Sequence, residues 1–373
     1  IQELSIENLG QAAIIGGYLS AIYAVMQFLC SPTLGNLSDR FGRRPVILFS
    51  LLALGIDYII MGFAPTLLVL FIGRLLAGIA GATHSTANAY MADISSPEDR
   101  TKNFGLVGAA FGLGFIAGPV IGGMVAEFGT RAPFFAAAAL VGLNFLYGMF
   151  VLPETLSQDK RREFLWKRAN PVGTIIQAFK IPGMLMFFAA FFLYQLSNMV
   201  YPSVWAYYTK ENFSWTAAQV GISLGAFGAM YALVQGGVIR LILAKLRESH
   251  TAVLGLVVTV IGMLIMVFID EGWMIYAVLP LTALGGVVVP ALSGVMSRSV
   301  SEDAQGELQG ALSSIMGITL IISPVMMTQI FGYFTSTSSS VYLPGGVFGV
   351  SAVIAMLSGI PLFFALRQTR RSK

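Results

Sequence analysis

Charged residues are scarce in this sequence of 373 residues, and their scarcity excludes most classes of soluble protein. Asp, Glu, Lys and Arg together make up 11% of the chain. A soluble domain carries roughly 25% charged residues. Hydrophobic residues make up 56%, and the mean hydropathy is +0.78. The composition therefore predicts a protein that lies in a lipid bilayer.

Cysteine and histidine are nearly absent as well. The one cysteine, Cys30, lies in an apolar run, which excludes a disulfide framework and a multi-cysteine metal site. The two histidines, His84 and His250, are far apart and form no metal-binding spacing. We expect no metal and no cofactor. Because the sequence contains no hydrolase, ATPase or redox motif, we do not expect an enzyme.

Long apolar runs fill the rest of the chain. A bilayer core needs about 20 apolar residues per helix. The sequence predicts eleven membrane-spanning helices, over 12–34, 45–63, 67–92, 103–127, 132–152, 182–208, 216–244, 251–268, 273–297, 306–333 and 342–366.

Positive charge alternates between the connectors of these helices. Nineteen of the 22 Lys and Arg lie in the C-terminal tail or near the connectors after the odd-numbered spans, whereas the opposite side holds only Arg131 and Lys210. The positive-inside rule places the C-terminus in the cytoplasm and Ile1 outside. The net charge of +4 is thus a topology signal, and we expect no nucleic-acid partner.

The most informative stretch is a short charged connector between the first two spans. Residues 35–45 read Gly-Asn-Leu-Ser-Asp-Arg-Phe-Gly-Arg-Arg-Pro. Glycine permits the sharp turn and close backbone approach that two neighbouring spans need. Asp39 can form an ion pair with a neighbouring arginine, or its carboxylate can interact with the N-terminus of another helix. Alternatively, the arginines only fix topology.

This stretch resembles the signature loop between the second and third helices of major facilitator superfamily transporters. The unbroken Ser-Asp-Arg-Phe-Gly-Arg-Arg-Pro of 38–45 is similar to the drug/proton antiporters of the tetracycline-efflux type. The resemblance implies a charge lock, made by Asp39 and Arg43, that closes the cytoplasmic side. It also implies a multi-pass protein of a plasma membrane or a bacterial inner membrane.

Asp93 ends the third span on the side where residues 35–45 lie, so we expect it to meet Arg43. An acidic residue at a helix C-terminus is unfavourable unless a cation is near. The expected gate residues are Gly35, Asp39, Arg40, Gly42, Arg43 and Asp93.

The resemblance implies an all-α membrane protein of two six-helix bundles. Residues 1–152 would form an N-terminal bundle with five visible spans, 153–181 a cytoplasmic linker, and 182–373 a C-terminal bundle with six spans. Since the family has twelve helices, we expect one helix to precede Ile1. The linker is either a solvated segment or a contact for anionic lipid. The loop at 237–250 that matches 35–45 has no aspartate, so a second charge lock is degenerate.

Asp57 and Arg74 are ionisable residues deep within their spans. A charge near the centre of a helix in a membrane needs a partner or a wet cavity. Both residues lie about 10 Å from the outer ends of consecutive antiparallel helices, at 1.5 Å per residue, so a pair is expected. Arg74, in Gly-Arg-Leu-Leu-Ala-Gly, also resembles the family's fourth-helix arginine, to which proton transfer is assigned. A purely structural ion pair is the alternative.

Residues 108–123 form a glycine-rich apolar helix that is not a dinucleotide-binding loop, because no strand precedes it. Small residues at four-residue intervals allow close helix packing, and general packing is one interpretation. The ending Gly-Pro-x-x-Gly-Gly resembles the fifth-helix motif of antiporters, which favours export. The residues that match it are Gly112, Gly118, Pro119, Gly122 and Gly123.

Polar and aromatic side chains within the spans are candidates for a substrate cavity. They either contact substrate or make hydrogen bonds between helices, and aromatic walls with scattered amides suit an amphipathic ligand. The candidates are Gln27, His84, Asn88, Tyr194, Gln195, Asn198, Tyr201, Trp205, Tyr231 and Gln235.

Two departures weigh against tetracycline itself as the substrate. Tyr231 stands where the tetracycline pumps carry a histidine, and Thr259 aligns with their aspartate in the ninth helix. His84 is a candidate for part of the proton chemistry lost at those two positions.

We therefore expect a proton-coupled antiporter that exports a small amphipathic or drug-like molecule by alternating access. Its partners would be a small-molecule substrate, protons and membrane lipid, and the protein would be a monomer. The alternative is a non-transporting protein of the same fold that serves as a scaffold or subunit of a larger membrane complex.

Overall fold

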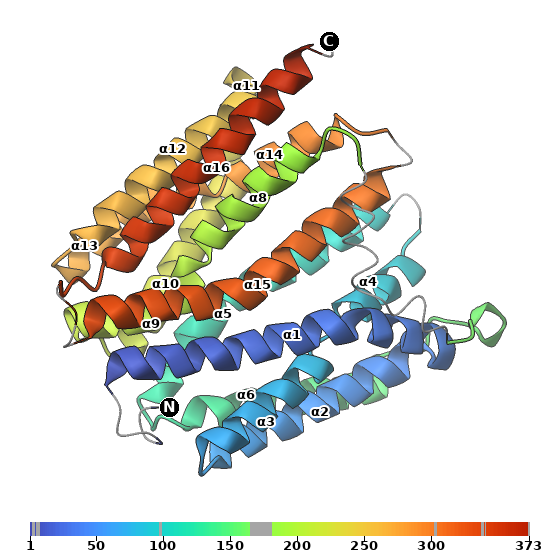
Figure 1. Cartoon of the computed structure of the whole chain (residues 1–373). Helices are drawn as coiled ribbons and strands as arrows, with labels where there is room; N and C mark the ends of the chain where they lie inside the picture. Colours follow the sequence, from blue (N-terminus) through green and yellow to red (C-terminus); the bar gives the residue numbers. More distant parts are fainter. Residues whose placement is uncertain are drawn as a thin grey trace. The chain divides into compact units, whose positions relative to one another are not determined.

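A computed structural model describes residues 1, 4, 8–96, 99–164, 181–301, 304–336, 339 and 341–371. Figure 1 traces its helices along the chain. The helices before the linker are α1 (Leu9–Phe41), α2 (Arg43–Phe63), α3 (Leu67–Ala80), α4 (His84–Asp93), α5 (Arg100–Ala126), α6 (Ala132–Val151) and the short η1 (Gln158–Lys160). Those after it are α8 (Leu185–Asn198), α9 (Val200–Phe213), α10 (Ala217–Leu233), the π turn η3 (Val234–Val238), α11 (Ile239–Lys245), α12 (Glu248–Val267), α13 (Gly272–Gly285), α14 (Val288–Ser297), α15 (Gln305–Thr335) and α16 (Gly346–Arg371).

Eleven helical segments of the described chain are long and apolar enough to cross a membrane. Four of them are interrupted: α3 with α4, α8 with α9, α10 with η3 and α11, and α13 with α14 each make one segment. The prediction of an all-α membrane protein with eleven visible spans is confirmed. The chain is thus a multi-pass integral membrane protein.

The connector expected over 35–45 is much shorter in the structure. Helix α1 continues to Phe41 and α2 begins at Arg43, so only Gly42 lies between them. Between Gly35 and Phe41 no proline or further glycine interrupts the sequence, and the polar residues there extend the helix beyond its apolar part. The charged residues of this stretch therefore lie on helices rather than in a loop.

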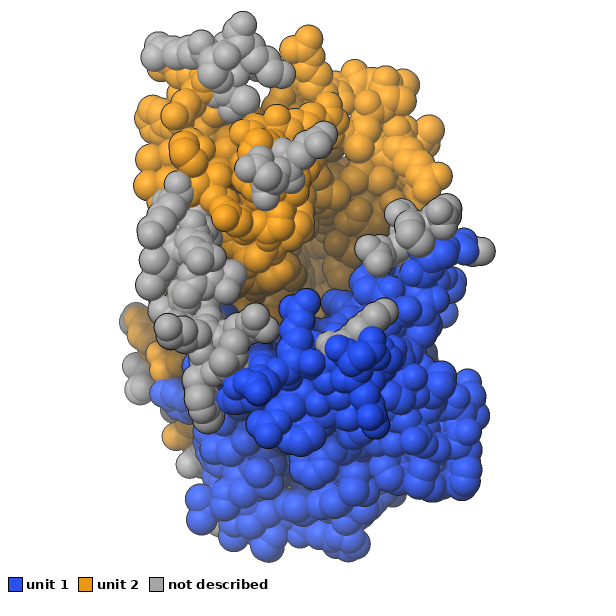
Figure 2. Space-filling view, turned by 90° about the vertical axis from the view of Figure 1, so that its right-hand side faces the viewer, with its two compact units in different colours: residues 1–6, 18–171 blue, residues 7–17, 172–373 orange. Residues whose placement is uncertain are grey.

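The chain divides into two compact units, which Figure 2 colours separately. Unit 1 consists of residues 1–6 and 18–171, and unit 2 of residues 7–17 and 172–373. The two ranges meet within the predicted linker. Residues 7–17 were expected in the N-terminal bundle, but they belong with unit 2, because the first turns of α1 pack closely on α15. A Cβ added to Gly10 would lie 2.8 Å from the Thr335 hydroxyl, and one added to Gly17 would lie 2.7 Å from the Pro324 carbonyl oxygen.

The helices within each unit pack in the same order. In unit 1, α2 packs against α3, α4 and α6; in unit 2, α12 packs against α13, α14 and α16. Helix α5 adjoins α4 and α6, as α15 adjoins α14 and α16. Helices α2–α6 therefore correspond to α12–α16, and α1 corresponds to α10–α11. Helices α8 and α9 cover α15 and α16 in unit 2.

Candidate functional site

The turn between α1 and α2 depends on the conformation of Gly42. Its φ is 105° and its ψ is 159°, a region of backbone space that is essentially restricted to glycine. The carboxylate of Glu154 lies where a Cβ of residue 42 would be. The sequence needs glycine here for two reasons, namely the backbone conformation and the approach of Glu154.

Directly after this turn, the guanidinium of Arg43 on α2 pairs with two carboxylates, one on α1 and one on α4. Nη1 of Arg43 lies 2.5 Å from Oδ1 of Asp39 on α1, and its Nε lies 3.2 Å from Oδ2 of Asp93 at the end of α4. Nη1 also donates to the Ser38 hydroxyl at 2.7 Å. Arg43 is buried, and burial makes such charge-assisted bonds stronger than exposed ones. The structure thus brings together the three residues of the predicted charge lock.

Glu154 holds the other side of the same turn. Its carboxylate accepts hydrogen bonds from the backbone N–H of Arg43 at 2.9 Å, of Arg44 at 3.2 Å and of Leu156 at 2.9 Å. A carboxylate at a helix N-terminus satisfies unpaired N–H groups and offsets the positive end of the helix dipole. It also balances the two arginines with which α2 begins.

The neighbouring residues attach the start of the linker to the charge lock. Thr155 donates its hydroxyl to Oδ2 of Asp93 at 3.2 Å, and the backbone N–H of Arg162 donates to the Asp39 carbonyl at 3.0 Å. The hydroxyl of Tyr90 donates to the Pro153 carbonyl at 3.3 Å. Residues 153–162, at the start of the predicted linker, are therefore hydrogen-bonded to the charge lock and to α4 within unit 1.

Two expected gate residues lie outside the ion-pair network. Gly35 lets α1 approach α4, since a Cβ there would lie 3.2 Å from the Ser85 hydroxyl. Arg40 borders an open cavity of about 400 Å³ together with Arg161 and Arg162. Arg40 thus lies beside the linker segment rather than beside Asp93.

Asp57 and Arg74 form a second charged pair. Nη2 of Arg74 lies 3.6 Å from Oδ2 of Asp57, and the Asp57 side chain is 1% exposed. Gly73 makes room for the carboxylate, because a Cβ there would lie 2.8 Å from Oδ1 of Asp57. Neither oxygen of Asp57 accepts a hydrogen bond from another described residue. The pair is therefore loosely held, and the buried carboxylate lacks the hydrogen bonds that usually accompany a buried charge.

Arg74 has two further neighbours. Its Nη2 lies 2.7 Å from the sulfur of Met61, and the centre of its guanidinium lies 5.6 Å from the centroid of the Tyr23 ring. A cation over the face of an aromatic ring is attracted by the ring's quadrupole. Tyr23 thus connects α1 to the charged pair between α2 and α3.

The glycine motif lies on α5, where the structure does not bring it into close helix contact within unit 1. A Cβ added to Gly112, Gly118 or Gly122 would meet no atom of the described residues within 4 Å. Gly123 is buried, and Pro119 lies inside an uninterrupted helix. A role of this motif in antiport stays a prediction.

The polar stripe of α8 and α9 is buried in the core of unit 2. Tyr194 donates its hydroxyl to the Gly285 carbonyl at 2.8 Å, and Nε1 of Trp205 donates to the Ser223 hydroxyl at 2.9 Å. Asn198 donates to the Tyr194 carbonyl at 3.4 Å, Gln195 is buried, and the Tyr201 ring contacts Phe227 and Phe348. The contacts of Tyr194, Trp205 and Tyr201 join different helices, whereas that of Asn198 lies within α8. A role of these residues in substrate binding stays a prediction.

The remaining cavity candidates lie near helix interruptions. Gln27 donates to the Gly81 carbonyl at 3.2 Å, and Gln235 donates to the Gly286 carbonyl at 3.0 Å. Tyr231 packs against Gly286. Asn88 is exposed on α4, and the side chain of His84 lies outside what the structure describes. The roles of all of them in substrate binding stay predictions.

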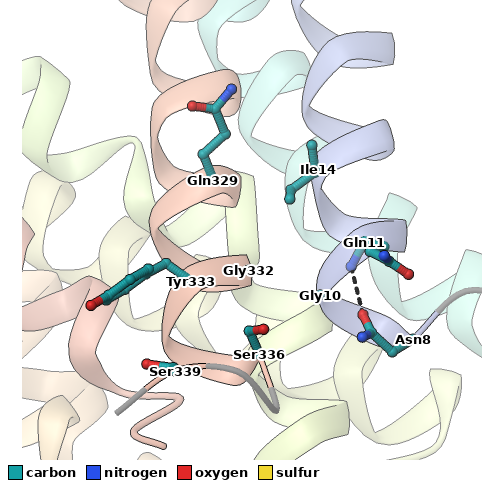
Figure 3. Close-up of a pocket in the computed structure, with 9 residues that line it drawn as sticks. All are labelled: Asn8, Gly10, Gln11, Ile14, Gln329, Gly332, Tyr333, Ser336 and Ser339. Atoms are coloured by element: carbon teal, nitrogen blue, oxygen red, sulfur yellow. Dashed lines mark hydrogen bonds between the residues drawn. The ribbon is translucent and has the colours of Figure 1, made fainter. Parts of the chain in front are cut away.

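A cavity of about 350 Å³ lies within unit 2, between the first turns of α1 and the last turns of α15 (Figure 3). It is lined by Asn8, Gly10, Gln11, Ile14, Gln329, Gly332, Tyr333, Ser336 and Ser339. Figure 3 shows the bond that the Gln11 backbone N–H donates to the Asn8 side chain, at 2.9 Å. The lining holds amides and hydroxyls but no acidic or basic side chain. It contains none of the residues that we predicted for the site.

Sequence reasoning missed Glu154 and Tyr23 as members of these networks. Glu154 carried a signal, because Pro-Glu-Thr at 153–155 resembles a step after the sixth helix of tetracycline-type pumps. Tyr23 carried no signal beyond its place one turn before Gln27.

Comparison with known proteins agrees with this arrangement. The family model described as Major Facilitator Superfamily matches residues 3–324 and, in a further match, residues 186–373. Tetracycline resistance protein, class C, of Escherichia coli is 42% identical over 321 residues, which cover 86% of this chain and 81% of that protein. The class E protein of Escherichia coli is 38% identical over 357 residues, covering 93% of this chain and 87% of that protein.

Solved structures share the fold. A crystal structure of the nucleoside transporter NupG superposes with a TM-score of 0.76, covering 96% of this chain and 94% of that one at 14% sequence identity. At this identity the likeness concerns the fold alone.

The contacts of Glu154 predict its effect on stability. Glu154→Ala removes the carboxylate that accepts hydrogen bonds from the first N–H groups of α2, and the loss of such a cap costs about 0.5–2 kcal/mol. Equilibrium unfolding of the purified protein in mixed micelles would measure the loss. Glu163→Ala, an exposed glutamate in the same segment, is the matched control. Equal stability of the two variants would contradict the assignment of Glu154 as the cap of α2.

Proposed function

Because the chain belongs to the major facilitator superfamily, we propose that it is a proton-coupled antiporter that exports a small amphipathic molecule. The observation that supports export rather than uptake is the 42% identity to a tetracycline resistance protein over 86% of the chain. Tetracycline-like compounds are the first substrates to test. Tyr231 and Thr259, which depart from that type, leave room for a related amphipathic drug.

The buried pair of Asp57 and Arg74 supports proton coupling. A carboxylate that is 1% exposed and faces a guanidinium at 3.6 Å changes the local charge when it takes up a proton. Such a change favours one of two access states if the states differ in how they accommodate the charge. Coupling between sites in proteins is typically about 1–3 kcal/mol. Proton uptake from one side and release to the other would then drive export.

The charge lock of Asp39, Arg43 and Asp93 supports alternating access. It joins α1, α2 and α4 at one end of unit 1 by direct ion pairs. We assign it to closing the cytoplasmic side in one of the two access states. The positive charge of the connectors supports a cytoplasmic location for this end and for the C-terminus.

The central experiment measures drug accumulation in cells that express the full-length protein, with and without a protonophore. Expression should lower accumulation of a tetracycline-like compound, and the protonophore should abolish the difference. Asp57→Asn should remove the protonophore-sensitive export, while substrate affinity changes by less than about fivefold, the lower end of ordinary coupling. Asp270→Asn, an exposed aspartate in the α12–α13 connector, is the control.

Each outcome of this experiment decides something. Export that persists in Asp57→Asn would place proton coupling at another residue. No export by the unmodified protein of any amphipathic compound tested would favour the non-transporting scaffold.

The charge lock gives a separate prediction. Asp39→Asn should reduce the export rate while expression and unfolding stay near those of the unmodified protein, because the Asp93 contact to Arg43 remains. Asp99→Asn, an exposed residue beyond α4, controls for loss of negative charge. Exchange of charge between Arg43 and Asp93 should be less harmful than either reversal alone, although Asp39 would then face a second carboxylate. Normal export by Asp39→Asn would refute the assignment.

Topology is tested with reporters on the two sides. A reporter fused after Lys373 should be active only in the cytoplasm, and a tag near Ser336 should be labelled from outside the cell. An external C-terminus would overturn the orientation of every span.

A further inference from the structure

In each unit, one of the interrupted spans contacts a tyrosine and a glutamine of a neighbouring helix. In unit 1 the interruption is residues 81–83, between α3 and α4; in unit 2 it is residues 286–287, between α13 and α14. We call these the α3–α4 break and the α13–α14 break. Helix interruptions at corresponding positions of two halves are typical of functional regions in transporters.

A glutamine from the neighbouring helix donates to the freed carbonyl at each break. In unit 1 the Gln27 amide donates to the Gly81 carbonyl, and in unit 2 the Gln235 amide donates to the Gly286 carbonyl. The bonds join residues 54 and 51 positions apart. Because a broken helix leaves carbonyls without an intrahelical partner, each amide satisfies a group that would otherwise be unpaired.

A tyrosine one turn before each glutamine packs on the same glycine. A Cβ on Gly81 would lie 2.7 Å from the Tyr23 hydroxyl oxygen, and a Cβ on Gly286 would lie 3.0 Å from Cδ2 of Tyr231. The two segments read Tyr-Ala-Val-Met-Gln at 23–27 and Tyr-Ala-Leu-Val-Gln at 231–235. The two tyrosine and glutamine pairs, which we call the clamps, are thus repeated in both sequence and structure.

The clamp of unit 1 has a neighbour that the clamp of unit 2 lacks. The ring of Tyr23 lies under the guanidinium of Arg74, which pairs with Asp57. The span of α13 and α14 carries no Asp, Glu, Lys, Arg or His. The α3–α4 span carries Arg74 before its break and Asp93, a member of the charge lock, after it. Unit 2 also has an ion pair beyond its break, between Arg298 after α14 and Glu248 at the start of α12, but the described span before that break holds no charged pair. The clamp of unit 1 is therefore the one that lies between a charged pair and a charge lock.

We propose that Tyr23 and Gln27 are positioning residues that couple the charge of Asp57 to the charge lock through the α3–α4 break. When Asp57 is neutral, Arg74 loses its ionic partner and shifts on the Tyr23 ring. Tyr23 and Gln27 hold Gly81, so the shift changes the angle between α3 and α4. That angle sets the distance of Asp93 from Arg43. The proposal rests on the proposed proton-coupled function and names the contacts that would carry it.

The test is a double-mutant cycle with a readout that needs neither substrate nor transport. Coupling between two groups is measured as the departure of their combined effect from additivity. Asp57→Asn removes the charge, and Gln27→Met removes the donor while keeping the length of the side chain. The readout is amide hydrogen exchange of α4, residues 84–93, in the purified full-length protein in lipid nanodiscs.

Asp57→Asn alone should change the exchange rate of α4 at least about fivefold, the lower end of typical coupling. In the Gln27→Met background the same substitution should change it less than twofold. Gln235→Met is the matched control, since it removes the equivalent bond at the α13–α14 break, and it should leave the response to Asp57→Asn intact.

Three results would overturn the proposal. The first is an exchange rate of α4 that does not change after Asp57→Asn. The second is a full change of that rate after Asp57→Asn in the Gln27→Met background. The third is an equal loss of the change in the Gln235→Met background, which would indicate a general loss of stability. If Gln27→Met does not fold, Tyr23→Phe serves instead. It keeps the ring against Arg74 and removes only the hydroxyl, and it should at least halve the response. A full response in that variant also overturns the proposal.

The two proposals can fail separately. Additive exchange effects together with protonophore-sensitive export would refute only the role of the clamp. Absence of export together with a non-additive cycle would refute only the transport proposal.

Discussion

The structure of unit 1 depends on a turn of one residue between two long helices. Gly42 adopts a conformation that other residues avoid, so α1 and α2 meet almost directly. This brings Asp39, at the end of one helix, beside Arg43, at the start of the next. It also exposes the first N–H groups of α2 to Glu154. A longer connector would leave these charges in solvent, where an ion pair contributes little.

Much of this arrangement could be predicted because the bilayer restricts where charges can lie. The eleven spans could be predicted from apolar length, and the pairing of Asp57 with Arg74 from their depth on consecutive helices. The contact of Asp93 with Arg43 could be predicted because both residues lie on one side of the membrane. The family resemblance drawn from residues 38–45 is confirmed by the family model and by the relatives.

The remaining features depend on backbone groups, which a sequence does not display. Gln27 and Gln235 were expected to line a cavity, and this stays a prediction; the bond that each donates to a carbonyl at a helix break could not be predicted. Glu154 bonds to backbone N–H groups more than 100 residues away. The extent of α1 was underestimated because polar residues after Gly35 suggested a loop. In each case the partner is a main-chain atom whose availability depends on where a helix begins or ends.

The π turn at Val234–Val238 adds one residue to the helical turn between α10 and α11 in unit 2. A π turn contains about one residue more than an α turn, so the helix beyond it is rotated by about 100° around its axis. Gln235 keeps its place at the α13–α14 break, whereas Arg240 and Lys245 face elsewhere than an uninterrupted helix would direct them.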